Sequence, residues 1–206
     1  GKLAAILYKE EIERAFKTKG VSGFQLLDLH DFPGQGTALV GLLDAFWDSK
    51  NLIEAEKFRE FCGPVVPLIR FNKATYTNNE LFEASTELAN YGKDDLNNFR
   101  ISWSISSANN ILKQGQMDLS SVKSGSIKET GRFTADLSSL TSASKLKVQL
   151  WIEGTEYRNS WEIWVYPSSL QINKGSVIVT SDIKTALDEL QKGKKVLLSP
   201  EPEKIK

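Results

Sequence analysis

The chain has 206 residues, of which 40% are hydrophobic and 25% are charged, a composition typical of soluble globular proteins. Lys and Arg together number 26, as do Asp and Glu, so the formal net charge is zero. Because no long run of one sign is present, the sequence argues against nucleic acid as a partner, and no apolar stretch reaches the roughly 20 residues of a membrane-spanning helix.

The residue types that most often build metal and redox sites are nearly absent. Cys62 is the only cysteine and His30 the only histidine, which excludes an internal disulfide, a cysteine-based metal cluster and a site with several imidazoles. We therefore predict no metal and no cofactor, and we interpret Cys62 as a small buried apolar residue. A single cysteine does not indicate the cellular compartment. A periplasmic or secreted parent protein is a separate expectation.

The first 66 residues carry helical and strand patterns in alternation. Apolar positions at helical spacing predict an amphipathic helix over residues 2–19, and Gly20 is a stop signal. Residues 21–30 form a short apolar run that predicts a buried strand. Residues 51–54 resemble a capping box that opens a helix through Phe61. The buried face of that helix is expected to contain Leu52, Ala55, Phe58 and Phe61.

The pattern changes to strict alternation after Gly63, Pro64 and Pro67, where we place a domain boundary. Apolar and polar residues alternate in five segments, and two weaker runs bring the total to about seven strands in about a hundred residues, the size of an immunoglobulin-like sandwich. The five segments are residues 82–88, 99–105, 133–137, 146–152 and 161–166, and the weaker runs are 68–71 and 111–117.

The C-terminal stretch predicts a strand, a helix and a second strand between residues 177 and 199, with Asp182 as N-cap and Gly193 as C-cap. One such βαβ unit cannot bury its own faces, so we expect it to open a further α/β domain. The fold class is therefore mainly β: an immunoglobulin-like β-sandwich over residues 67–168, flanked by partial α/β segments at 1–66 and 169–206.

Residues 23–50, GFQLLDLHDFPGQGTALVGLLDAFWDSK, resemble the closing part of the catalytic barrel in bacterial glycoside hydrolase family 2, the β-galactosidase and β-glucuronidase group. The resemblance covers roughly the first 167 residues, because the family also places a helix and an immunoglobulin-like domain after this segment. It implies that residues 1–66 are the end of a (β/α)8 barrel. It also implies a parent that cleaves β-linked sugars with retention, through two glutamates on earlier strands that this chain does not contain. We therefore expect no catalytic residue in this chain and no activity of the chain alone.

The resemblance places the loop after the last barrel strand at the rim where substrates bind. Its candidate substrate contacts are Asp28, His30, Asp31 and Gln35. Asp28 and Asp31 are three apart on one predicted strand, so their side chains leave opposite faces and do not form a catalytic pair.

Three aromatic residues fall out of phase with the apolar positions around them, which predicts that they face outward, where flat rings stack on sugars. They are Trp151, Trp164 and Tyr166, and the alternative is that they cover core edges. Two functions compete. The first is a hydrolase fragment that supports the catalytic barrel, with carbohydrate bound through the parent and with neighbouring domains of the same polypeptide as partners; an exposed apolar patch would favour it. The second is a stand-alone carbohydrate-binding or interaction module, favoured by outward aromatics along one groove.

Overall fold

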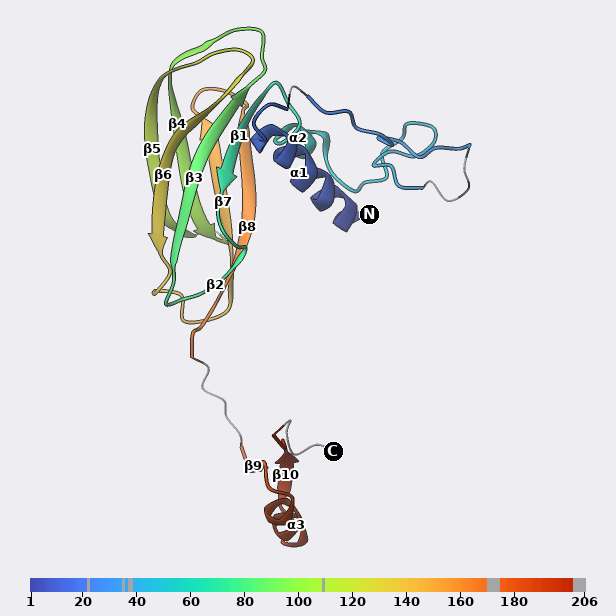
Figure 1. Cartoon of the computed structure of the whole chain (residues 1–206), viewed down its shortest axis with the longest axis vertical. Coiled ribbons are helices and arrows are strands. Elements are labelled where there is room, and N and C mark those ends of the chain that lie inside the picture. The colour runs from blue at the N-terminus through green and yellow to red at the C-terminus, as the bar shows by residue number, and fades with distance from the viewer. Residues whose placement is uncertain (22, 35, 37–38, 109, 170–174, 202–206) are drawn as a thin grey trace. The chain divides into compact units, whose positions relative to one another are not determined.

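A computed structural model describes residues 1–21, 23–34, 36, 39–108, 110–169 and 175–201. The chain divides into two compact units, Gly1–Ser168 and Ser169–Lys206 (Figure 1), and each unit is described by itself. None of the helices within the described ranges is long and apolar enough to cross a membrane.

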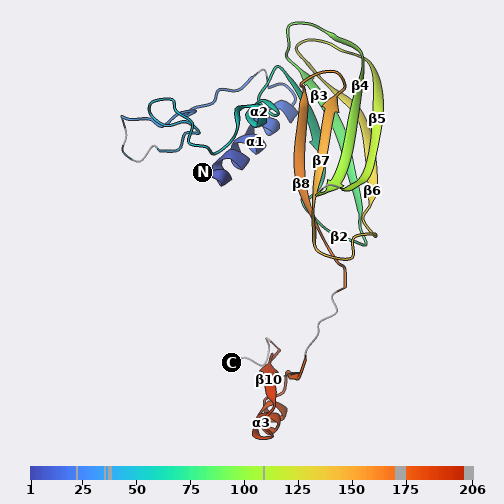
Figure 2. The same cartoon turned by 180° about the vertical axis from the view of Figure 1, so that it is seen from behind.

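The first unit contains two sheets that pack face to face (Figures 1 and 2). One sheet has the strand order β1-β3-β6 and the other the order β2-β8-β7-β4-β5, and all neighbouring strands are antiparallel except the parallel pair β2 and β8. The strands are β1 Val65–Arg70, β2 Thr75–Thr77, β3 Leu81–Asn90, β4 Leu96–Ser107, β5 Asn110–Val122, β6 Ser126–Asp136, β7 Ser144–Ile152 and β8 Arg158–Tyr166. This architecture confirms the predicted mainly β class with a β-sandwich.

Alternation along the strands builds the core between the sheets. In β7, for example, Leu146, Val148, Leu150 and Ile152 are buried while the residues between them are not. Aromatic rings fill the centre, where the Trp103 indole stacks on Phe133 at 4.0 Å between ring centroids. Gly115 lies against that indole. A β-carbon at this position would be 2.7 Å from Trp103 Cζ2, so only glycine leaves room for the ring.

The N-terminal part of this unit differs from the sequence prediction in two places. Helix α1, Lys2–Lys17, is confirmed, but the described residues among 21–30 form no strand and contribute only a single bridge between His30 and Leu43. A buried strand needs neighbouring strands on both sides, and none of the described residues provides them, so Leu27 in this segment is 79% exposed. The predicted strand is therefore wrong for this structure, and the barrel assignment of residues 1–66 stays a prediction.

The second difference concerns the helix after residue 51. Helix α2 is confined to Ala55–Arg59, and its N-cap Glu54 makes no side-chain cap. Asn51 lies in the left-handed region with φ 54°, outside the extended conformation that an N-cap adopts, so the predicted capping box does not form. Phe61 is buried as expected, whereas Ala55 is exposed.

The second unit forms the predicted βαβ motif: strand β9 Val177–Thr180, helix α3 Ile183–Gln191 and strand β10 Lys195–Leu198, with β9 and β10 parallel. Asp182 caps the helix by accepting a hydrogen bond from Thr185 N at 2.7 Å. Gly193, with φ 74°, follows the helix as the left-handed residue that ends it.

Candidate functional site

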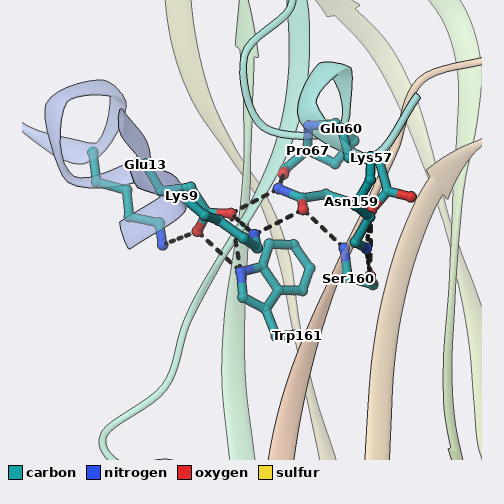
Figure 3. Close-up of polar contacts among 9 residues, drawn as sticks. Lys9, Glu13, Lys57, Glu60, Pro67, Asn159, Ser160 and Trp161 are labelled. Atoms are coloured by element: carbon teal, nitrogen blue, oxygen red, sulfur yellow. Dashed lines mark hydrogen bonds and ion pairs between the residues drawn. The ribbon is translucent and has the colours of Figure 1, made fainter. Parts of the chain in front are cut away.

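A buried polar cluster joins α1 to the sandwich, and we name it the Glu13 cluster: Lys9, Glu13, Lys17, Asn159 and Trp161 (Figure 3). Glu13 is only 2% exposed. Its carboxylate accepts hydrogen bonds from both lysines, from Asn159 Nδ2 at 2.9 Å and from Trp161 Nε1 at 2.9 Å. Asn159 Nδ2 also donates to the Pro67 carbonyl at 2.9 Å, so the cluster connects α1, β1 and β8.

The electrostatics of the cluster follow from burial and pairing. Burial raises the pKa of Glu13, but the charges and hydrogen bonds of Lys9 and Lys17 outweigh burial and hold it below its usual range. Burial lowers the pKa of Lys9, and attraction to Glu13 opposes that shift. Because both Glu13 oxygens are occupied by several donors, this carboxylate fixes the helix and has no free position for acid-base chemistry.

We call residues 28–50 the Asp28–Lys50 loop. An ion pair between Lys50 and the buried Asp31 joins the two ends of this loop. The Asp31 carboxylate accepts hydrogen bonds from Lys50 Nζ at 2.9 and 3.0 Å and from Gly41 N at 2.9 Å. A side chain at Gly41 would place a β-carbon 2.3 Å from the His30 carbonyl carbon, so only glycine permits this approach. The hydrogen bond from Lys50 and the one from Gly41 hold the pKa of Asp31 below its usual range.

The same loop presents two aromatic side chains to solvent. The Asp44 carboxylate accepts from Phe46 N at 2.8 Å and from Asp48 N at 3.0 Å, which fixes the turn that carries Phe46 and Trp47. Phe46 is 85% exposed, and Trp47 is 60% exposed with φ 70°. The His30 ring stacks on Trp47 at 4.4 Å between centroids, so the loop holds a solvent-facing aromatic pair beside Phe46.

Three of the four predicted substrate contacts, Asp28, His30 and Asp31, lie near one another in this loop. Each of them contacts a different partner. Asp28 is half-buried and its carbonyl accepts from the Tyr8 hydroxyl at 3.2 Å, while His30 is engaged by Trp47 and Asp31 by Lys50. Gln35 lies outside the described residues. Their role as sugar contacts stays a prediction.

Exchanging Asp31 for asparagine is expected to loosen this loop, because the ion pair to Lys50 is lost. The Gly41 amide should then exchange its proton several-fold faster, as measured by NMR hydrogen exchange, with Ile163 in the sandwich unchanged. Asp48→Asn, at an exposed position of the same loop, is the matched control. The pKa of Asp31 is depressed in the folded chain. The ion pair therefore contributes fully at pH values above the ordinary pKa of 3.8, and its contribution is lost as the pH falls through the folded-state pKa.

The three candidate stacking residues lie on the outer face of the five-stranded sheet but not in one groove. Trp164 and Tyr166 are exposed and neighbour each other on β8. Trp151 is half-buried on β7 and pairs with Arg158, six residues before Trp164 and therefore about 20 Å along β8. Among the described residues, no group of three or more His, Cys, Asp or Glu is placed to hold a metal ion.

A family model described as "Domain of unknown function (DUF8488)" matches residues 80–167, which span β3 to β8. A comparison with curated proteins finds no match. Solved structures include similar chains at low identity, among them a β-glucosidase, a cycloisomaltooligosaccharide glucanotransferase and a β-glucuronidase.

Three of these structures illustrate the level of similarity. The alkylpurine DNA glycosylase AlkC of Pseudomonas fluorescens is 14% identical over 52% of this chain and 32% of its own, with a TM-score of 0.40. The CARDB domain of the PF1109 protein of Pyrococcus furiosus is 12% identical over 50% and 94%, with a TM-score of 0.38. A β-glucuronidase from glycoside hydrolase family 2 is 14% identical over 53% and 12%, with a TM-score of 0.35. The chain thus matches about a third of the DNA glycosylase and about an eighth of the glucuronidase.

Proposed function

We propose that the chain is a non-catalytic supporting part of a longer carbohydrate-acting protein. In this proposal residues 1–66 complete a catalytic barrel, and the sandwich supports that barrel from the side of α1. The parent cleaves β-linked sugars with retention through carboxylates outside these 206 residues. Asp28, His30, Asp31 and Gln35 then contribute contacts at the rim of its substrate site.

The observation that carries the proposal is the exposed apolar surface of the N-terminal part. Helix α1 leaves Leu3, Ile6 and Leu7 exposed at helical spacing, on a side that none of the described strands covers. The segment after it adds a larger set: Phe24, Leu27, Phe32, Leu39, Val40, Phe46 and Trp47. So many exposed large apolar side chains within one part of a chain favour an interface with further protein.

The sandwich, in contrast to this exposed apolar surface, has a closed core, which favours its role as a support for a neighbouring domain. Its core is closed, with buried residues contributed by both sheets, and the Glu13 cluster ties α1 to it through β1 and β8. A second small core packs Phe16 of α1 on the outer face of β1, against Val66 and Leu68. The helix is therefore held from one side by the sandwich while its other side stays open for a neighbouring domain.

A stand-alone carbohydrate-binding module is the second candidate. The exposed pair Trp164 and Tyr166 favours it, because two adjacent outward rings on a flat sheet offer stacking faces to a sugar chain. This candidate leaves the apolar surface of the N-terminal part without a role, and so we place it second.

Hydroxyl-radical footprinting of this chain beside the longer protein encoded by the same locus tests the leading proposal. We expect Phe46 and Trp47 to be oxidised readily in this chain and several-fold more slowly in the longer protein, because a neighbouring domain covers them there. Trp164 and Tyr166 are the internal controls and should react equally in both proteins. Equal oxidation of Phe46 and Trp47 in the two proteins would contradict the supporting role and favour the stand-alone module.

A further inference from the structure

A network of polar side chains lies on the outer face of the five-stranded sheet, at the Trp151 end. Glu153 Oε1 accepts hydrogen bonds from Ser102 Oγ at 2.6 Å and from Gln116 Nε2 at 3.3 Å. Arg100 Nε donates to Asp118 Oδ1 at 2.7 Å, and Arg100 Nη1 lies 3.9 Å from Glu153 Oε2. We call these five residues the Glu153 network; they come from β4, from β5 and from the position directly after β7.

Trp151 borders this network through strand register. It pairs with Ser102 of β4, which places the two β-carbons about 5 Å apart on the same face. Glu153 follows two positions later, and its backbone N–H donates to the Arg100 carbonyl at 3.0 Å, so the ladder continues to that residue. The half-buried indole and the polar network thus form one continuous surface.

A shallow hollow lies beside one end of the network. Arg100 and Asp118 line this open cavity of about 540 Å³ together with Asn98, Phe99, Leu119 and Ser120, whereas Glu153 and Trp151 lie outside its lining. Asp118 is 76% exposed and Glu153 40% exposed at their side chains, so both carboxylates are accessible to hydroxyl donors from solvent. Phe99 and Leu119 pack toward the core between the sheets, so the apolar part of this surface is the Trp151 indole and the polar part is the Glu153 network.

The charges of the network restrict the ligand. The network has two carboxylates and one guanidinium, and Arg158 adds a second guanidinium beside Trp151, so the surface has no excess of either charge and suits a neutral ligand. An acidic sugar would bring its carboxylates against Asp118 and Glu153. Carboxylates accept from hydroxyl groups, while the guanidinium and the Gln116 amide donate to hydroxyl and ring oxygens. An indole beside them offers a flat apolar face to the C–H side of a pyranose ring.

We propose that the Glu153 network and Trp151 form a binding site for a neutral oligosaccharide. The site is separate from the barrel rim, and it stands whether the chain supports a glycosidase or acts alone. Its specificity comes from paired hydroxyl contacts to Asp118 and Glu153, with Trp151 stacking on an adjacent ring.

Isothermal titration calorimetry of the 206-residue chain tests this site with three probes: cellohexaose, β-1,4-galactohexaose and the acidic oligogalacturonate of the same length. We expect saturable binding of at least one neutral probe and at least roughly tenfold weaker binding of the acidic one. Asp118→Asn and Glu153→Gln should each weaken binding of the neutral probe by about tenfold, because each removes charged acceptors for sugar hydroxyls.

Matched controls lie on the same sheet face at the other end, where Lys145 Nζ pairs with Glu162 at 2.6 Å beside Trp164. Glu162→Gln and Trp164→Ala should leave binding within about twofold, and thermal unfolding of every variant confirms that it is folded. No binding of either neutral probe overturns the site, as does equal or greater loss in the control variants, which places binding at Trp164. None of these outcomes depends on the footprinting of Phe46 and Trp47, so the two proposals fail separately.

Discussion

Replacing Glu13 by alanine is expected to lower the free energy of unfolding by about 3–5 kcal/mol, because it leaves the nearly buried Lys9 ammonium without its carboxylate. The substitution also removes an acceptor from Asn159 Nδ2 and the acceptor of the buried Trp161 Nε1. Urea denaturation at neutral pH measures the loss. Glu11→Ala, at an exposed position two residues earlier on α1, is the control and should change stability by less than about 0.5 kcal/mol.

The same cluster predicts a direction with pH. The folded-state pKa of Glu13 is depressed, so its contribution is complete above the ordinary value of 4.5 and is lost as the pH falls through the folded-state pKa. The difference in stability between the natural chain and Glu13→Ala should therefore shrink on acidification below that value. A difference that stays constant across that range, or one below about 1 kcal/mol at neutral pH, would contradict the assignment of Glu13 as the charge that fixes α1.

Replacing Phe82 by alanine is expected to cost about 3–5 kcal/mol of unfolding free energy, through lost burial and the cavity left behind. Phe82 of β3 is fully buried and contacts Tyr76 of the other sheet at 5.5 Å and Phe133 at 6.1 Å between ring centroids. The ring therefore joins its own sheet to the edge strand β2 of the other sheet.

The neighbouring Leu81 provides the control for Phe82, since it points to the opposite face and is exposed. Leu81→Ala should change stability by no more than about 0.5 kcal/mol, as read from thermal and urea unfolding. A similar loss for both variants would mean that the alternation of β3 does not decide which side chains build the core.

The sandwich was predictable because the alternation of apolar and polar residues that defines it can be read within each strand. Side chains alternate between faces of a strand, so the apolar phase of residues 99–105 and 146–152 already indicates which side packs inward. The same phase argument predicts that Trp164 and Tyr166 face outward, as they do. The βαβ motif and the Asp182 cap were also local, because the capping bond spans three residues.

The Glu13 cluster was not predictable, because its partners are far apart in sequence. Lys9, Glu13 and Lys17 have the spacing of ordinary surface ion pairs on a helix, which are worth little. Only the docking of α1 on β8 buries them, through Asn159, which is 146 positions from Glu13. The one signal in the sequence is that three consecutive helical turns carry alternating charge on one stripe.

The wrong strand prediction and the missed Glu153 network have physical causes of the same kind. Residues 21–30 are apolar enough for a buried strand, but a strand forms only where other strands pair with it. The Glu153 network was missed because Ser102, Gln116 and Glu153 meet only once the register of β4, β5 and β7 is known. Composition and spacing carry no record of that register.

Hydrolysis of a panel of chromogenic β-glycosides by this chain beside the longer protein from the same locus tests the central claim most directly. We expect turnover by the longer protein and none by the 206-residue chain, because the proposed function assigns the carboxylates that cleave the glycosidic bond to residues outside it. Turnover by this chain alone would contradict a supporting role and would place a catalytic pair among the residues described above.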